Sequence, residues 1–209
     1  FYDPLTQLPN RRMLQDRLHL MMTANSRNEQ LNALLFIDLD HFKTLNDTQG
    51  HNVGDRLLIA VAARIQDSLR EGDLVARLGG DEFVTMIVNA GDNEVTASKV
   101  AEEVGEKIRL SICKPYKLSI EEESGIKNEI VFYCTPSIGI SIFNSNLANH
   151  DEILKQADVV MYQAKSAGRN TIRFFDPAMQ ITLEKNVALL AELHQAIDND
   201  ELELYYQIQ

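Results

Sequence analysis

Arg77-Leu78-Gly79-Gly80-Asp81-Glu82-Phe83 places two glycines and two adjacent acids between apolar runs at 74–78 and 83–88. Because glycine tolerates the positive φ angles that tight turns need, this stretch predicts a β-hairpin with Gly-Gly-Asp at its tip. Neighbouring carboxylates at such a tip repel each other, and a divalent metal ion that carries a phosphate ester would relieve the repulsion. A solvated acidic turn is the alternative that this stretch alone leaves open.

A second acidic pair follows a short apolar run at 34–37, which is typical of a buried central strand and ends in Asp38-Leu39-Asp40. Residues two apart on a strand point to the same side, so Asp38 and Asp40 are expected to share a face. A carboxylate at the end of a buried strand needs solvent, a partner or a metal ion. If the hairpin pairs with this strand, its acids lie beside Asp38, whereas Asp40 is expected to cap a helix that begins near His41.

The composition is that of one sizeable soluble domain with some additional material. The 209 residues include 31 acids and 20 bases, for a net charge of −11. This balance argues against a nucleic-acid partner, which would need clustered Lys and Arg, but not against a nucleotide. Cys113 and Cys134 are too few for a disulfide framework and favour a cytoplasmic location. No apolar run approaches the roughly 20 residues of a membrane helix, and a first residue other than Met indicates a fragment of a longer parent, whose membrane attachment stays open.

Apolar periodicity predicts an α/β (α+β) fold in which helices pack on a mixed sheet with an antiparallel hairpin. A charged loop is expected at 121–128. After Asp176-Pro177 the pattern changes to a helix and the start of a strand, so 177–209 are interpreted as a linker and the first strand of a second, truncated domain. Helices are expected at about 10–27, 53–69, 93–111 and 151–167, and strands at 34–37, 116–120, 130–143 and 171–175.

Polar residues that follow the acidic strand could bind a nucleotide. Residues 42–47 are expected to form a short helical turn and a loop, in which Lys43 could offset charge on a transferring phosphoryl group. Asn46 and Asp55 could read a guanine or ribose edge. The structural alternatives are a turn residue for Asn46 and an acid near a helix N-terminus for Asp55.

Two further pairs of charged residues have both a functional and a structural interpretation. Lys165 and Arg169 are four apart at the expected end of a helix, where they could hold a triphosphate or simply complement the helix dipole. Arg70 and Asp73 are expected by default to form an exposed ion pair of little energetic consequence.

Taken together, these motifs resemble the GGDEF diguanylate cyclase domain, which condenses two GTP molecules into the bacterial second messenger cyclic di-GMP and releases pyrophosphate. The resemblance covers essentially the first 175 residues. Gln7 departs from it, since the family often has Gly there. The matching segments occur in family order as Asp3-Pro4-Leu5-Thr6-Gln7-Leu8-Pro9-Asn10-Arg11, Asp38-Leu39-Asp40-His41-Phe42-Lys43, Asn46-Asp47, Gly50-His51, Gly54-Asp55, Arg77 through Phe83, Ser137-Ile138-Gly139 and Ala164-Lys165-Ser166-Ala167-Gly168-Arg169-Asn170.

For residues 1–176 the resemblance implies a ferredoxin-like, palm-type mixed sheet flanked by helices, similar to nucleotidyl cyclases. It implies that Asp38, the Leu39 carbonyl and Asp81 hold Mg²⁺ or Mn²⁺. Glu82 would also serve the metal or act as the base, and which of Asp81 and Glu82 takes the proton stays open.

The resemblance also implies a substrate site and an inhibitory site. Arg70-x-x-Asp73 matches the family's product site, at which bound cyclic di-GMP would inhibit synthesis. The phosphates would be held by Lys43, Lys165 and Arg169, the guanine and ribose by Asn46 and Asp55, and the substrate site would also include Phe42, Gly79 and Gly80.

The C-terminal segment is similar to the opening of an EAL cyclic di-GMP phosphodiesterase domain, through residues 189–193 and 204–209, although Ile208 stands where that family usually has Pro. The leading hypothesis is an active, Mg²⁺-dependent diguanylate cyclase that works as a homodimer. The alternative is a catalytically silent module that binds GTP or cyclic di-GMP and regulates an adjacent EAL domain. The intact Asp38, Lys43, Asp81 and Glu82 favour the enzyme.

Overall fold

The computed structural model describes residues 1–24, 30–121, 127–144 and 150–176, and Phe1–Phe175 form a compact unit. The predicted linker and second-domain strand at 177–209 lie outside the described residues. Within the described ranges no helix is long and apolar enough to cross a membrane. The elements are α1 Arg11–Ala24, β1 Leu31–Leu39, α2 Phe42–Gln49, α3 His51–Ser68, β2 Leu74–Gly79, β3 Glu82–Gly91, α4 Glu94–Ile112, β4 Tyr116–Glu121, β5 Lys127–Phe132, β6 Pro136–Asn144, α5 His150–Ser166 and β7 Ile172–Phe174.

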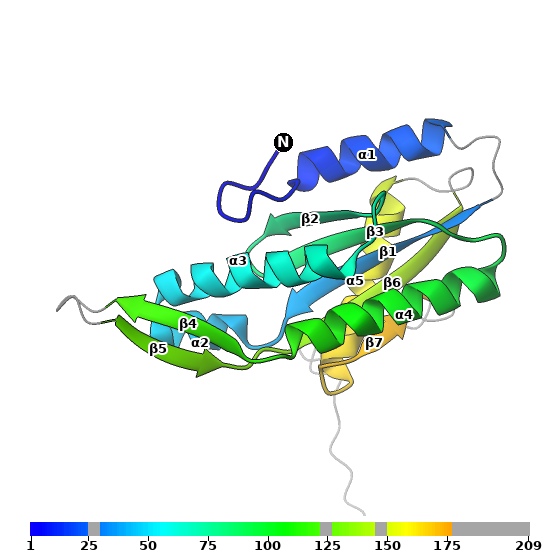
Figure 1. Ribbon diagram of the computed structural model, residues 1–209. Coiled ribbons are helices and arrows are strands. Elements are labelled where there is room, and N and C mark those ends of the chain that lie inside the picture. Colours follow the sequence, from blue (N-terminus) through cyan, green and yellow to red (C-terminus); the bar gives the residue numbers. More distant parts are fainter. Residues whose placement is uncertain (25–29, 122–126, 145–149, 177–209) are drawn as a thin grey trace, which may run out of the picture. The chain divides into compact units, whose positions relative to one another are not determined.

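The main sheet has five strands in the order β2-β3-β1-β6-β7 (Figure 1). Neighbours are antiparallel except for β6 and β7, which are parallel, so the sheet is mixed as expected. β1 lies in the centre, which explains why every residue from 32 to 39 is buried. The predicted core strand at 34–37 is confirmed, and it is longer than its apolar run alone indicates.

Helices cover both faces of this sheet, and β1 contributes to both hydrophobic clusters. Leu35 and Ile37 pack with residues of α3 and α4, whereas Leu34 and Phe36 pack with residues of α1 and α5. Figure 1 shows α4 and α5 on opposite sides of the sheet. Because side chains alternate along a strand, Asp38 points to the same face as Leu34 and Phe36, towards α5. Strand alternation therefore decides which helix this acid meets.

The hairpin predicted from the two glycines is confirmed. β2 and β3 pair in antiparallel register up to Gly79 and Glu82, and Gly80 and Asp81 form the connection between them. Gly79 has a φ of 144° and Gly80 a φ of 53°, in the region that side chains disfavour. The glycines therefore allow the tight reversal that brings the two acids to the end of β1.

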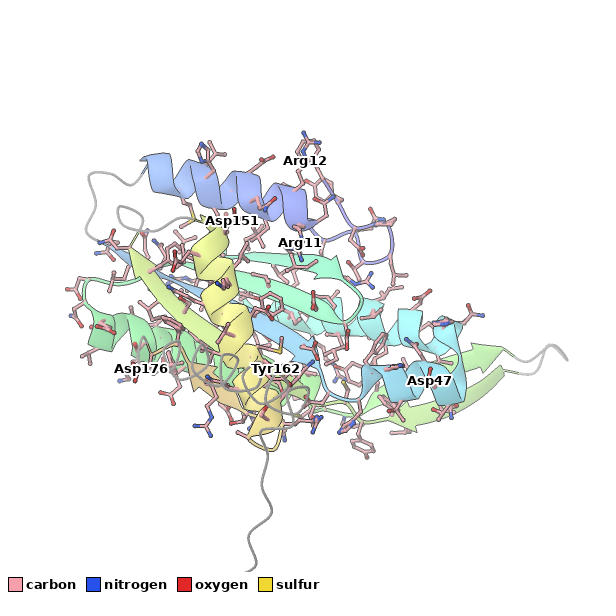
Figure 2. All side chains as sticks on the ribbon, turned by 180° about the vertical axis from the view of Figure 1, so that it is seen from behind. Arg11, Arg12, Asp47, Asp151, Tyr162 and Asp176 are labelled. Carbon is pink, nitrogen blue, oxygen red and sulfur yellow. The ribbon has the colours of Figure 1, made fainter. Side chains whose placement is uncertain are left out.

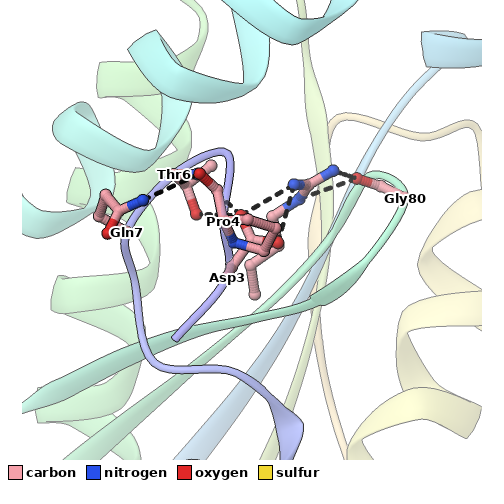
Figure 3. Close-up of polar contacts among 6 residues, drawn as sticks. Asp3, Pro4, Thr6, Gln7 and Gly80 are labelled. Carbon is pink, nitrogen blue, oxygen red and sulfur yellow. Dashed lines mark hydrogen bonds and ion pairs between the residues drawn. The ribbon is translucent and has the colours of Figure 1, made fainter. Parts of the chain in front are cut away.

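The N-terminal loop fixes the tip of this hairpin (Figure 3). The Arg77 guanidinium donates to the Gly80 carbonyl at 2.7 and 3.1 Å and to the Asp3 carboxylate at 2.9 and 3.2 Å. Asp3 also accepts from the backbone N–H and the hydroxyl of Thr6. Gln7, which replaces the Gly common in the family, has a φ of 59°. A left-handed backbone at this position explains why glycine suits it.

The strand predicted over 130–143 is two strands in two different sheets. β5 ends at Phe132 and pairs with β4, whereas β6 begins at Pro136 and pairs with β1. The break has a backbone cause, because the Thr135 carbonyl accepts from the N–H of Asp40 at 2.8 Å and Pro136 has no N–H to donate. The small sheet also extends to Glu121 and Lys127, so the expected charged loop is shorter than 121–128.

Candidate active site

A cavity of about 250 Å³ opens at the C-terminal end of β1. Its walls come from the end of β1, the start of α2, the hairpin tip and the segment at the end of α5. Many residues that the sequence indicates as site residues therefore share one hollow, although they are far apart in the chain. The lining residues are Asp38, Leu39, Asp40, His41, Phe42, Lys43, Thr44, Asp81, Lys165 and Arg169.

The first acid of this cavity is buried and faces both positive and negative neighbours. Asp38 is 5% exposed, stands opposite Glu82 in the β1–β3 register and lies 2.7 Å from the Lys165 ammonium. Burial raises the pKa of Asp38 to about 6; Lys165 opposes this rise, and the charges of Asp81 and Glu82 add to it. The expectation that the hairpin brings its acids beside Asp38 is confirmed. The cluster holds more negative charge than Lys165 alone can balance.

This excess charge fits a divalent cation that arrives with a nucleotide. Among the described residues, no three Asp, Glu, His or Cys side chains form a metal site by themselves. Mg²⁺ typically takes one or two carboxylates and completes its shell with phosphate oxygens and water. Asp38, Asp81 and Leu39, whose carbonyl is the third expected ligand, border the same cavity. The donor set is therefore suitable for Mg²⁺ bound together with phosphates rather than for a free-standing metal centre.

The two hairpin acids line different hollows. Asp81 borders the cavity at the end of β1, whereas Glu82 borders a neighbouring cavity of about 270 Å³ together with Arg11 and Asp158. Figure 2 shows Arg11 at the start of α1 and Asp151 at the start of α5, which bound this second cavity. Burial raises the pKa of Glu82, and the Asp158 carboxylate raises it further. The structure thus distinguishes two adjacent acids that the sequence treats as a pair.

Asn46 and Asp55 lie outside the lining of either cavity. Residues 42–49 form the two-turn helix α2 rather than a single turn and a loop, so Asn46 is helical and not a turn residue. Its side-chain oxygen is buried and has no hydrogen-bond partner. Asp55 is exposed in the first turns of α3. A buried acceptor without a partner is uncommon, and the polar edge of a ligand would account for it.

Gly54 is a residue to which the sequence analysis assigned no role. A Cβ at this position would lie 2.0 Å from the Asn46 side-chain oxygen and 3.2 Å from Phe42. Only a glycine on α3 therefore lets the Asn46 carboxamide lie where it does. The spacing of residues 46 and 54 in the sequence did not predict this contact between α2 and α3.

The prediction that Asp40 caps a helix is wrong. The N-cap residue of α2 is His41, which makes no side-chain capping bond, and the Asp40 carboxylate has other partners. Its carboxylate accepts from the Thr135 hydroxyl at 2.7 Å, the Ser137 hydroxyl at 2.7 Å and the Asn170 backbone N–H at 3.0 Å. These donors come from β6, from the residue before it and from the segment after α5. None of them was visible as a partner from the sequence.

Lys165 and Arg169 both line the cavity, but they are not one helical turn apart as predicted. α5 ends at Ser166, and Gly168 follows with a φ of 108°. Arg169 lies beyond the helix with a φ of 62°, and its N–H donates to the Ala164 carbonyl at 3.1 Å. This backbone bond closes the helix end in the manner of a Schellman motif. The structural alternative for Arg169, a charge on the last helical turn, is thereby wrong.

Arg70 and Asp73 form the ion pair that was the default expectation, but only the Arg70 side chain is exposed. The Asp73 side chain is 1% exposed and accepts from the Val88 N–H at 3.2 Å. Arg70 donates to the carbonyls of Val88 and Asn89 at 2.6 and 3.3 Å, and its Nε lies 3.5 Å from Asp73. The pair therefore ties the turn before β2 to β3. Neither residue lines the cavity at the end of β1.

Comparison with known proteins agrees with this fold and this collection of residues. The model of the GGDEF family, described as "Diguanylate cyclase, GGDEF domain", matches residues 1–171. The chain is 39% identical over 206 residues to the bifunctional diguanylate cyclase/cyclic di-GMP phosphodiesterase MucR of Pseudomonas aeruginosa, covering 99% of this chain and 28% of MucR. It is 32% identical over 209 residues to the cyclic di-GMP phosphodiesterase NbdA of the same organism, covering 99% of this chain and 24% of NbdA. The chain thus spans about a quarter of the length of these relatives.

Solved structures show the same architecture. The GGDEF domain of TpbB from Pseudomonas aeruginosa superposes with a TM-score of 0.76 at 33% identity, covering 88% of this chain and 99% of that one. The coiled coil and GGDEF domain of DgcB from Caulobacter crescentus, in complex with cyclic di-GMP, gives a TM-score of 0.70 at 28% identity, covering 83% and 84%. The expected palm-type mixed sheet flanked by helices is confirmed.

Proposed function

Since the chain belongs to the GGDEF family of diguanylate cyclase domains, we propose that it condenses two GTP molecules into cyclic di-GMP and two pyrophosphates. The observation that carries this proposal is the cavity at the end of β1, where the buried Asp38 meets Asp81 and the cations Lys43, Lys165 and Arg169. Carboxylates for a nucleotide-borne metal next to several cations form a site suited to a triphosphate.

The phosphate end of GTP occupies this cavity. Lys43 and Arg169 are exposed, line this cavity and contact the phosphates, while Lys165 exchanges its contact with Asp38 for one with the nucleotide. Asp38, the Leu39 carbonyl and Asp81 would hold Mg²⁺ or Mn²⁺, which would supply neutralisation of the phosphate charge. Glu82, which borders the adjoining cavity, is a further candidate for the metal or for the base.

Guanine binds towards α2 and α3. Asp55 accepts from the N1–H and the N2 amine of guanine, a donor pair that adenine lacks. Asn46 uses its partly buried carboxamide, whose oxygen has no protein partner, on the base or ribose edge. The site therefore selects GTP over ATP through hydrogen bonds that adenine cannot make.

The chemical step requires two domains face to face, each with one GTP. The 3′-hydroxyl of one nucleotide attacks the α-phosphorus of the other in line, the bond from that phosphorus to the oxygen bridging the α- and β-phosphates breaks, and pyrophosphate leaves with the electron pair. Asp81 or Glu82 takes the proton of the attacking hydroxyl. Repetition at the second site closes the ring. The protein therefore acts as a homodimer, and cyclic di-GMP bound at Arg70 and Asp73 inhibits it.

A second candidate function is a silent nucleotide-binding module that regulates an EAL phosphodiesterase domain in the same protein. The observation that favours it is the 32% identity to the phosphodiesterase NbdA across this whole chain. In that case GTP or cyclic di-GMP binds without turnover.

Incubation of the concentrated 209-residue chain with GTP and Mg²⁺, followed by chromatography for cyclic di-GMP, distinguishes the two functions. Asp81→Asn removes one carboxylate from the cavity, and Asp67→Asn removes an exposed carboxylate on α3 as the matched control. Product formed by the parent and by Asp67→Asn but not by Asp81→Asn supports the cyclase. If GTP binds but no product forms even after two copies are fused, the regulatory module is the better description.

A further inference from the structure

We propose that Asp40 is a positioning residue for Arg169, and that it acts by holding the left-handed turn at residues 168–170 against the end of β1. The inference rests on the proposed function, because Arg169 is taken to contact the GTP phosphates. In this role the Asp40 carboxylate contacts the protein and not the substrate.

Asp40 is buried, at 6% exposure, and both of its carboxylate oxygens are engaged. One oxygen accepts from the Ser137 hydroxyl at 2.7 Å. The other accepts from the Thr135 hydroxyl at 2.7 Å and the Asn170 backbone N–H at 3.0 Å. Three donors leave little capacity for a metal ion. This separates Asp40 from Asp38, which lies two residues earlier on β1 and faces Lys165 instead.

The turn that Asp40 holds has an unusual backbone. Gly168, Arg169 and Asn170 have φ values of 108°, 62° and 47°, so three successive residues lie in the left-handed region. Glycine and asparagine adopt this region readily, but arginine does so only under constraint. Such a conformation persists where the surrounding structure fixes it. The bond from Asn170 to Asp40 supplies one of these constraints.

The side chain of Asn170 supplies a second anchor on the other side of the turn. Its oxygen accepts from the Arg109 guanidinium at 2.7 Å. Arg109 is itself fixed on α4 by two hydrogen bonds to Glu106, at 2.6 and 2.8 Å. Asn170 thus connects α4 to the end of β1, and both contacts immediately follow Arg169 in the chain.

The two contacts of Asn170, with Asp40 and with Arg109, form a clamp on the turn. The Arg169 side chain depends on this clamp for its place in the cavity. It is exposed and lines the cavity, and within the described part of the chain no hydrogen bond or ion pair to its guanidinium is present. Its direction is therefore set by its own backbone. If the turn relaxes, Arg169 leaves the phosphate site, whereas Asn46 on α2 and Asp55 on α3 are unaffected.

Charge repulsion alone predicts the opposite change in the affinity for GTP. Removing a negative charge near a triphosphate should strengthen GTP binding, because like charges repel. Loss of the clamp should weaken it. Asp40→Asn therefore separates the two effects, since the amide keeps the shape but presents donors where Asp40 accepts.

The test measures dissociation constants for GTP and for guanosine by calorimetry with Asp40→Asn, Arg169→Ala and the double variant. We expect Asp40→Asn to weaken GTP binding about tenfold, to leave guanosine binding unchanged, and to have little further effect once Arg169 is removed. Asp47→Asn, an exposed acid on α2 (Figure 2), is the matched charge control and should not weaken GTP binding. Asn170→Ala, which removes the Arg109 anchor, should repeat the GTP-selective loss if Asp40→Asn fails to fold.

Tighter GTP binding by Asp40→Asn, equal losses for GTP and guanosine, or an undiminished effect in the Arg169→Ala background would overturn the inference. Each of these results leaves the proposed function standing. Failure of the parent chain to bind GTP at all would overturn both.

Discussion

Gly54→Ala tests the proposed guanine site, because it adds one carbon at a place that the Asn46 side chain already fills. The new Cβ would lie 2.0 Å from the Asn46 oxygen, and ordinary contact begins at 3.4 Å, so that oxygen must move by 1.4 Å (3.4 − 2.0). A side-chain amide can swing away, so the helix need not unfold. Alanine is also favoured over glycine within a helix by about 0.5–1 kcal/mol, which offsets part of the cost of the displacement.

The expected result is a folded protein with a defect in base recognition. A displacement of this size would break the hydrogen bonds that we propose between Asn46 and the nucleotide; each is worth about 1 kcal/mol, so losing one or two weakens GTP binding about 5- to 30-fold. Calorimetric titration with GTP and ATP should show that the preference for GTP falls to the level of Asn46→Ala. The two substitutions should not be additive, because they remove the same contact.

Gly105→Ala is the matched control. It also places alanine within a helix, but its Cβ would meet side-chain methyl groups of the core, with Ile172 nearest at 3.1 Å. We expect it to change the free energy of unfolding and to leave nucleotide selectivity intact. If Gly54→Ala binds GTP and ATP as the parent does, while Asn46→Ala loses its preference, then Gly54 does not place Asn46 and the reasoning fails.

Three further outcomes follow from the contacts described above. The folded-state pKa of Asp38, about 6, exceeds the ordinary 3.8, so its contribution to stability is fully present below about pH 4 and is lost as the pH rises through 6. Without divalent metal, Asp38→Asn should therefore flatten the fall in unfolding free energy between pH 4.5 and 7.5, by about 2 kcal/mol in urea titrations; an unchanged pH dependence would contradict this. Arg64→Met should lower the free energy of unfolding by about 2 kcal/mol, because the Arg64 guanidinium donates to carbonyls at the end of α4 and to the Pro115 carbonyl, and lies 3.5 Å over the Tyr116 ring; equal stability in urea would show that these contacts are replaced by water. Arg70→Ala should remove inhibition by cyclic di-GMP in the synthesis assay while GTP turnover persists, and inhibition that survives would exclude the product site from Arg70.

Local chemistry explains how much of the site could be predicted from the sequence. Two glycines between two short apolar runs favour a hairpin, because glycine adopts the φ angles found at Gly79 and Gly80 at less cost than other residues. A continuous apolar run specifies a central strand, and side-chain alternation then places Asp38 on a defined face. These are short-range rules. They bring Asp38, Asp81 and Glu82 together as soon as β1 and β3 pair.

The resemblance to the family predicted more of the fold than apolar periodicity could. Strand pairing in the order β2-β3-β1-β6-β7 joins segments separated by long stretches of chain, and apolar spacing does not encode which strands become neighbours. The single strand expected at 130–143 shows the limit. Strand-favouring residues continue to Thr135, but the Thr135 carbonyl bonds to the N–H of Asp40 and the chain passes from one sheet to the other.

The sequence by itself determined the hairpin, the central strand and the acids at their junction, because turn chemistry and alternation act over a few residues. Only the tertiary structure decided what Asp40, Arg169 and Gly54 do. Asp40 takes its partners from residues 95, 97 and 130 positions away in the chain, and the Arg169 backbone is held by one of them. Gly54 matters because the Asn46 side chain of α2 occupies the space that a Cβ on this part of α3 would need. Such contacts depend on how the elements pack, and no local pattern specifies them.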